Sequence, residues 1–565
     1  MKIKSRTPGL EGFSLVLVLV FTGVLFLLLS GVLAWTTTHS NLTQRYNEYY
    51  DGIAAAEAAT EKVVASIAAD FQSSGVNGVD ANLANYGATV PTPGEVSDWA
   101  GYEFDDPSGA QNATYVSKLT AWQYSDLNWK YAGFKGSNSV YRVISNARNT
   151  ASRYNITSAV KQEIQIVSIP LFEFGVFYSL DMELCALWEN FTVPGRVHCN
   201  GTIYSMPNQV TVTFSGDVTA AQKILATNSP SDPYNNRTLG TNIYQREHDW
   251  NVSSLNLPLG TNNNPINLHA LIEIPPGTEL TSSLMGLQRY YNKADLILLV
   301  SNTNVTARSG AYNGFATTID WTNINSFVNT NVSFNDARES KTIKATQIDV
   351  AKFATNSNYN NLSSLLGRPV KTLYVADLRT QISSTKPGVR LVNGKALPAA
   401  GLTVATLNPL YVLGHYNAPN SSLGTNNTSQ TVPASLVADA FTVLSGGWTD
   451  PNGGSQVNDT TVNAAVLAGI VPSDGSNFSG GVENFLRLLE NWNSHTLTFN
   501  GSMAALFPSQ TATSPWEAGS YYFPPVRMFS FDPNFLDNTM LPPGTPWVRT
   551  IVRSSWNITQ ANSTQ

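Results

Sequence analysis

Histidine, serine and lysine motifs are the first places to look for chemistry in this sequence. None of the six histidines has a second histidine four positions further on, and no H-E-x-x-H occurs, so a zinc-protease site is not indicated. No G-x-S-x-G nucleophile turn is present. Gly394-Lys395 is followed by Ala396, which excludes a phosphate-binding P-loop. The sequence therefore predicts no catalytic residue, no metal site and no cofactor, and the protein is not expected to be an enzyme.

The two cysteines suggest a structural role. His198 and Cys199 are adjacent, and neighbours on a strand point to opposite faces, so they could not share a proton there. Cys185 and Cys199 are close enough in sequence to form a disulfide between neighbouring strands, which would contribute roughly 3 kcal/mol for a loop of about 15 residues. We predict this disulfide outside the membrane, with two buried free thiols as the alternative.

The segment from Asp450 to Asp459 is rich in Asp, Asn and Gly, and it offers hard oxygen ligands of the kind that Ca²⁺ prefers. It lacks the ligand spacing and the bidentate Glu of an EF-hand. A plain turn is the favoured interpretation.

The composition excludes one class of partner. The chain has 565 residues, a net charge of −6 and no run of Lys or Arg, whereas a nucleic-acid-binding protein needs a basic surface. Charged residues make up 13%, about half the usual share, and Asn, Ser and Thr take their place. Such a neutral polar surface is typical of β-rich proteins outside the cytoplasm. With 42% hydrophobic residues, the chain can bury a substantial core.

The element that dominates the N-terminus is an apolar run from Phe13 to Trp35 without a single charge. As a helix it would be about 35 Å long, enough to cross a hydrocarbon core of about 30 Å. The cations Lys2, Lys4 and Arg6 precede it, so the positive-inside rule places Met1 in the cytoplasm. The run is longer than the apolar part of a cleaved secretory signal.

The helix is predicted to continue beyond the apolar run. Apolar residues recur every three or four positions and define one face, the predicted stripe: Leu42, Tyr46, Tyr49, Ile53, Ala56, Thr60, Val63 or Val64, Ile67 and Phe71. One helix from Phe13 to Phe71 would be about 88 Å long.

The N-terminus resembles that of a type IV prepilin. A short basic leader ends in Gly, and "GFSLVLVLV" is followed by "AAAEAATEKVVASI", which is similar to the helix of PilX-type minor pilins. The resemblance implies that a prepilin peptidase cuts the bond between Gly12 and Phe13 and methylates Phe13. Major pilins have Glu at the fifth mature position, where this chain has Leu17, a difference shared with many minor pilins and pseudopilins. Glu11 stands where Lys or Arg is common before the cut.

Beyond the helix, β structure is expected. Tyr141–Ala147 and Thr157–Ile169 read as strands, the second with Val160, Ile164 and Ile166 on one face. Short β segments with Asn-Gly corners, such as Asn200-Gly201, favour either the stacked coils of a β-solenoid or ordinary hairpins. Leu284–Ala294 and Val482–Asn491 are predicted to be short helices.

The predicted fold class is a long N-terminal helix, comprising a membrane span and an amphipathic half, followed by a large mainly β head. The predicted divisions are a leader at residues 1–12, a transmembrane segment at 13–35, an amphipathic helix at 36–72, a β-rich connecting region at 73–170, and a head at 171–565 that is either a β-solenoid or built of hairpins.

Phrases in the head, including "VHCNGTIY" and "LPPGTPWVR", resemble segments of large PilX-like pilus-assembly proteins of bacteria. The resemblance implies a minor pilin or pseudopilin of a type IV pilus or type II secretion-like filament. It would be anchored in the inner membrane with its head periplasmic or displayed on the cell surface. Its partners would be other pilin subunits and a prepilin peptidase. A membrane-anchored β-solenoid enzyme or carbohydrate-binding protein is the alternative, and abundant N-x-S/T triplets leave a eukaryotic signal-anchored glycoprotein as a third. The sequence names no ligand for the head.

Overall fold

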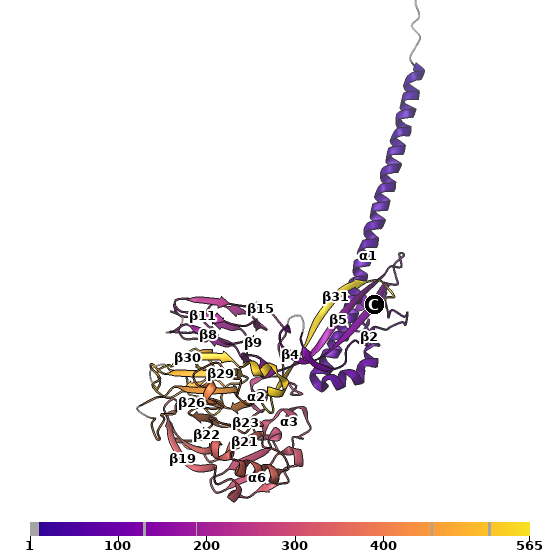
Figure 1. Ribbon diagram of the computed structural model, residues 1–565. Helices are drawn as coiled ribbons and strands as arrows, with labels where there is room; N and C mark the ends of the chain where they lie inside the picture. Colours follow the sequence, from indigo (N-terminus) through magenta and orange to yellow (C-terminus); the bar gives the residue numbers. More distant parts are fainter. Residues whose placement is uncertain are drawn as a thin grey trace, which may run out of the picture.

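The structure is a computed structural model that describes residues 11–127, 131–187, 189–234, 236–453, 456–517 and 521–564. A long helical element, α1 (Glu11–Tyr86), which is broken at Gly75, projects from a β-rich body, and its N-terminal end lies farthest from that body (Figure 1). The predicted fold class is confirmed in its main features: a long apolar N-terminal helix precedes a large, mainly β region with a few short helices. Most of the predicted leader, residues 1–10, lies outside the described residues.

The lower part of α1 packs on an antiparallel sheet, and together they form what we call the proximal domain. The strands in spatial order are β1 (Tyr102–Asp105), β4 (Lys135–Asn149), β5 (Thr157–Pro170) and β31 (Trp547–Thr559), with β2 (Tyr115–Lys118) and β3 (Gln123–Asp126) also paired to β4. The alternation predicted for β5 is present, because Val160, Ile164 and Ile166 are fully buried. Both long strands were predicted from their sequence.

The last strand of the chain completes this sheet. β31 pairs antiparallel with β5, with Ile551 opposite Ile166. The head, residues 171–546, is therefore inserted between two neighbouring strands of the proximal domain. The helix predicted to end at residue 72 breaks at Gly75, and a second helical stretch then runs to Tyr86. The predicted division differs from the structure at residues 547–559, which belong to the proximal domain, where Val548 and Val552 of β31 are buried.

The first part of the head winds in stacked coils, the first two of 21 residues each and the third of 30. Val176 of β6 pairs in parallel with Val197 of β9, which pairs with Val218 of β12. Three sheets arise in this way, made of every third strand: β6 (Val176–Tyr178), β9 (Val197–Cys199), β12 (Val218–Ala220) and β15 (His248–Trp250); β7 (Met182–Leu184), β10 (Ile203–Ser205) and β13 (Ile224–Leu225); β8 (Phe191–Val193), β11 (Thr211–Phe214) and β14 (Thr241–Tyr244). The pairing within each set is parallel.

After these coils the chain passes to the far end of the head and winds back. One parallel sheet contains β20 (Lys341–Asp349), β22 (Thr385–Val392), β24 (Pro409–Leu413), β26 (Ala440–Leu444) and β28 (Arg487–Leu488), with β19 (Val328–Asp336) antiparallel at its edge. The facing sheet contains β16 (Leu296–Val300), β21 (Thr372–Asp377), β23 (Leu402–Ala405), β25 (Ala434–Ala438), β27 (Thr460–Ala468) and β29 (Thr496–Ala505). β29 then pairs in parallel with β6, so the two parts of the head share one continuous sheet.

The other elements of the head are short. The helices are α2 (Pro265–His269), α3 (Leu284–Gln288), α4 (Tyr290–Lys293), α5 (Val350–Phe353) and α6 (Asn356–Leu366), and the edge strands are β17 (Val305–Ser309), β18 (Thr318–Ile319) and β30 (Val526–Phe531). The predicted helix at Leu284–Ala294 is thus two short helices. The predicted helix at Val482–Asn491 is wrong: a 3₁₀ turn, Val482–Asn484, is followed by the strand β28.

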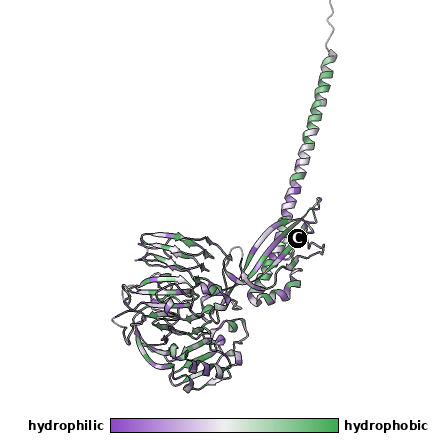
Figure 2. Cartoon of the chain, in the orientation of Figure 1, coloured by the Kyte–Doolittle hydropathy of each residue, from purple (hydrophilic) through white to green (hydrophobic). Residues whose placement is uncertain are grey.

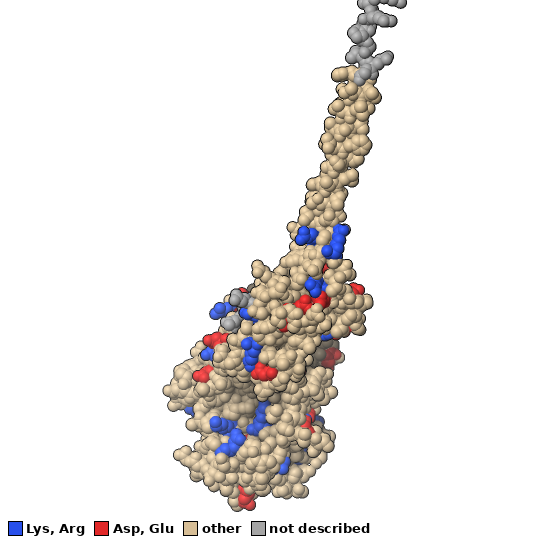
Figure 3. All heavy atoms as spheres, turned by 90° about the vertical axis from the view of Figure 1, so that its right-hand side faces the viewer, with Lys and Arg blue, Asp and Glu red and all other residues tan. Residues whose placement is uncertain are grey.

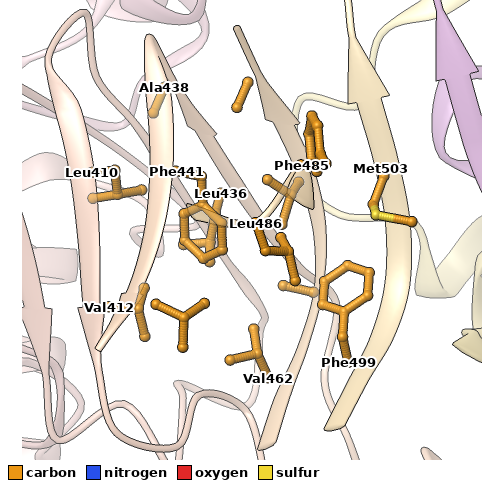
Figure 4. Packing of buried hydrophobic residues seen from close by; sticks show 14 of the residues in the cluster. Leu410, Val412, Leu436, Ala438, Phe441, Val462, Phe485, Leu486, Phe499 and Met503 are labelled. Carbon is orange, nitrogen blue, oxygen red and sulfur yellow. The ribbon is translucent and has the colours of Figure 1, made fainter. Parts of the chain in front are cut away.

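The core of the head is a ladder of apolar side chains that crosses the shared sheet. Paired positions on successive strands are all buried: Leu296, Leu373, Val404, Leu436, Val466, Met503, Val176, Val197 and Val218. Figure 4 shows Leu436 and Met503 among side chains of both sheets that fill the interior between them. Parallel in-register pairing therefore buries one apolar row along the whole head.

Candidate functional site

The part of α1 that extends beyond the body is the candidate functional site. Every residue from Phe13 to Ser40 is exposed, and the first Lys, Arg, Asp or Glu after Glu11 is Arg45. Figure 2 shows this segment as the most continuous hydrophobic stretch of the helix, and Figure 3 shows it free of charged side chains. So large an exposed apolar surface is unfavourable in water, so it requires a lipid or protein environment.

Five hydroxyls in this segment form hydrogen bonds within the helix. Thr22 donates to the carbonyl oxygen of Val18 at 2.6 Å, and Ser30 donates to that of Leu27 at 3.0 Å. Thr36, Thr37 and Thr38 make the same contact with the preceding turn. The helix is long and apolar enough to cross a membrane. These five hydroxyls would carry no unmet hydrogen bond into hydrocarbon.

The predicted processing residues lie at the tip of this helix. α1 begins at Glu11, so the bond between Gly12 and Phe13 belongs to its first turn. The Phe13 side chain is 67% exposed, and Leu17, one turn further on, is 47% exposed. The cut itself stays a prediction.

The predicted stripe marks where the helix meets its own sheet. From Ile53 onward its members are buried, including Val63, Ile67 and Phe71. Leu42 and Tyr46 are exposed above the edge of the sheet. The apolar face is therefore longer than the surface that this chain supplies to cover it.

Polar contacts, one buried and one exposed, fix the rotation of α1 on the sheet. Gln162 of β5 donates through Nε2 to the Thr60 hydroxyl and to Glu61 Oε1, both at 2.8 Å. Arg553 of β31 donates to Glu61 at 2.5 Å. Because these partners come from two strands, one helix orientation satisfies all of them.

α1 changes direction at Gly75, whose φ of 68° lies in the left-handed region that favours glycine. There Arg549 of β31 donates through Nη1 to the carbonyl oxygens of Phe71 and Gln72, at 2.8 and 3.0 Å. Gln72 Nε2 donates back to the Arg549 carbonyl at 3.0 Å. The end of the chain thus caps carbonyls that the helix break leaves unpaired. The sequence gives no sign of this contact beyond the presence of Arg549, one of two arginines in the last strand.

Both cysteines are free, buried thiols, so the predicted disulfide is not formed. Cys199 ends β9, and Cys185 follows β7, which belongs to a different sheet. The Cys199 thiol donates instead to the Leu180 carbonyl at 3.2 Å. Cys185 and Cys199 are close in sequence, but successive short strands of the coils lie in different sheets, so no bridge forms between the two thiols.

The carboxylate of Asp450 is occupied by other side chains and is not free to bind a metal ion. Arg390 binds both oxygens of Asp450, at 2.7 and 2.9 Å, and Trp448 Nε1 donates to one of them at 2.9 Å. Among the described residues, no group of three or more His, Cys, Asp or Glu side chains could hold a metal ion. Asp450 therefore serves as an internal anchor for Arg390.

Comparisons with known proteins give little guidance. No family model matches the chain, and no curated protein matches it. Among solved structures, the crystal structure of the competence-associated pilin ComZ from Thermus thermophilus is 9% identical, with 79% of this chain and 87% of that chain covered and a TM-score of 0.29. At that score the likeness carries no argument. The fold itself defines an elongated protein in which an exposed apolar helix projects from a β-rich body.

Proposed function

We propose that this chain is a minor subunit of a type IV pilus or a type II secretion-like filament. The observation that carries the proposal is the division of α1 into an exposed, uncharged half and a half packed on an antiparallel sheet. In a membrane the exposed half of α1 spans the bilayer, and in a filament the same surface packs against the equivalent helices of other subunits. The basic leader that ends in Gly12 supports this reading.

The proposal includes a location and partners. Before assembly the protein lies in the inner membrane with Met1 in the cytoplasm, and the proximal domain and head lie outside. Its partners are other pilin or pseudopilin subunits and a prepilin peptidase. The exposed Leu42 and Tyr46, next to the uncovered helix, support contact with neighbouring subunits.

We further propose that the head is a β-solenoid with a structural role rather than a catalytic one. Parallel pairing of every third strand in the first coils, and of alternate strands further on, supports the solenoid. Insertion of the head between β5 and β31 supports the structural role, because both ends of the head are attached to the proximal domain.

Maturation tests this proposal. Mass spectrometry of the protein from its native membrane should give an N-terminal peptide that starts with methylated Phe13. Gly12→Leu should abolish this peptide, because the peptidase needs a small residue at the cut. Gly9→Leu, in the same leader but away from the cut, is the matched control and should be processed normally.

Two results would count against the proposal. Methylated Phe13 in the Gly12→Leu protein would show that the cut does not depend on this motif. An intact Met1 in the wild-type protein would favour a signal-anchored protein instead.

A further inference from the structure

A cavity of about 230 Å³ lies at the seam where the last coil of the head joins the first. The first coil contributes Tyr178, Asp181 and Glu183 to its lining. The segments around β28 contribute Ser473, Ser479 and Arg487, and the turn after β19 contributes Arg338. Such a volume is below that of sites for drug-sized ligands, so the cavity suits a molecule of monosaccharide size.

Arg338 is the unusual residue of this cavity. It is only 8% exposed, yet within the described part of the chain its one hydrogen bond runs from Nε to the Ser514 carbonyl, at 3.1 Å. No described carboxylate lies within 4.0 Å of it. Burial lowers the pKa of Arg338 to about 10, which leaves it a cation at neutral pH. A buried guanidinium with unused donors is costly unless an anion meets it.

The nearby carboxylates are already engaged. Glu339 binds Lys386 Nζ at 2.9 Å and Arg487 Nη2 at 3.0 Å. Asp336 accepts from the Tyr411 hydroxyl at 2.7 Å and from the Glu339 backbone at 2.9 Å. At this end of the cavity Arg338 is thus left without a carboxylate partner of its own, while Asp181 and Glu183 belong to the other end of the lining.

The opposite wall offers neutral hydroxyls and hydrogen-bond acceptors. Glu183 Oε2 accepts from Ser473 at 2.7 Å and from Ser479 at 3.3 Å. Ser229 and Ser231 add two more hydroxyls, and Tyr178 adds an aromatic side chain. This end suits the hydroxyl groups and the ring face of a sugar.

We propose that the seam cavity binds a sugar acid, with the carboxylate on Arg338 and the ring hydroxyls on the serine-lined wall at Glu183. The guanidinium fork matches a carboxylate, and an acid of this kind supplies a partner for the donors of Arg338 that the described residues do not use. The site goes beyond the proposed filament role and does not depend on it. The sugar acid could be free or the end residue of a polysaccharide.

Calorimetric titration of the full-length protein in detergent micelles tests the site. Glucuronate should bind at least tenfold more tightly than glucose, which has the same ring without the carboxylate. Trigalacturonate distinguishes the two sources: tighter binding than glucuronate indicates a polymer end, and weaker binding indicates the free acid. Three results would overturn the proposal. They are no binding heat with either glucuronate or trigalacturonate, equal affinity for glucuronate and glucose, and tighter binding of the amino acid glutamate than of glucuronate.

Variants locate the binding. Arg338→Met should weaken glucuronate binding at least tenfold and leave glucose binding unchanged, because it removes only the carboxylate partner. Arg246→Met removes an exposed arginine of the same head and should change neither affinity. If Arg338→Met does not fold, Arg338→Lys keeps the charge without the fork and should weaken glucuronate binding roughly threefold to tenfold. Unchanged glucuronate affinity in the folded variant that is measured would contradict the assignment.

Discussion

At the scale of single residues, the thiols have a testable state. Burial is the main cause that raises the pKa of both, for Cys199 to about 12, so little reactive thiolate forms at pH 8. We expect a thiol reagent at pH 8 to label neither cysteine in the native protein. After unfolding without reductant, alkylation followed by mass spectrometry should label both. A protein that stays unlabelled when unfolded would contain the disulfide that the structure lacks.

His269 provides a residue-scale prediction about pH. Burial by itself lowers its pKa, but hydrogen bonds to Asp439 at 3.1 Å and Glu273 at 2.7 Å outweigh burial and leave the pKa raised. A raised pKa in the folded state means that the histidine stabilises the fold fully below its unfolded pKa of about 6.5. This contribution is lost as the pH rises through the folded pKa.

Chemical unfolding at pH 6 and pH 9 measures this effect. Between these values the wild type should lose more free energy of unfolding than His269→Gln does, because only the wild type loses the charged pair. His248→Gln removes an exposed imidazole from the same head and is the control. Equal losses in the wild type and His269→Gln would show that the pair with Asp439 has no net charge stabilisation.

At the scale of elements, the helix break at Gly75 depends on the last strand. Arg549→Met removes the donors to the carbonyls of Phe71 and Gln72, and we expect it to lower the free energy of unfolding of the proximal domain by about 1–3 kcal/mol. Hydrogen exchange should increase in the turn of α1 before Gly75. Arg553→Met, which removes an exposed ion pair with Glu61, should cost less than about 1 kcal/mol. Equal costs for the two variants would refute a special role for Arg549.

The elements also show which sequence patterns were sufficient to predict secondary structure. β5 was predictable because Val160, Ile164 and Ile166 lie on the face that meets the helix, with Lys161 and Glu163 between them on the other face. The spacing of Val482, Phe485, Leu486 and Leu489 fits a helix equally well, but there the side chains pack around a 3₁₀ turn and a strand of two residues. Short apolar segments do not specify helix or strand without their neighbours.

At the scale of the whole molecule, the apolar run was enough to predict the projecting helix. Stacked coils were one of the two arrangements predicted for the head, but their 21-residue period escaped detection. Only isolated positions such as Val176, Val197 and Val218 repeat, and the longer third coil breaks the period. The return of β31 to β5 could not be predicted either, since local sequence does not encode which distant edge a strand joins. The seam cavity forms only where the last coil of the head pairs with the first, so it could not be predicted from local sequence either.

The last prediction concerns assembly and depends on the proposed function. Leu17 stands where major pilins place the Glu that pairs with the N-terminal amine of a neighbouring subunit, and it lies exposed one turn after Phe13. This chain can offer its Phe13 amine to another subunit's Glu but cannot return the pairing, and an unpaired charge inside a helix bundle is costly. Each contact between two copies would therefore leave an amine unpaired.

We expect that the protein expressed alone forms no long filaments under the electron microscope, and that it is a sparse component of sheared pili by quantitative mass spectrometry. Leu17→Glu supplies the missing carboxylate and should raise its share among sheared subunits. Leu19→Glu, with the charge two positions away on another face of the helix, should not raise that share, because no amine meets it. Long filaments made of the wild-type chain alone would show that pairing at this position does not limit assembly, and the minor-subunit role would then be wrong.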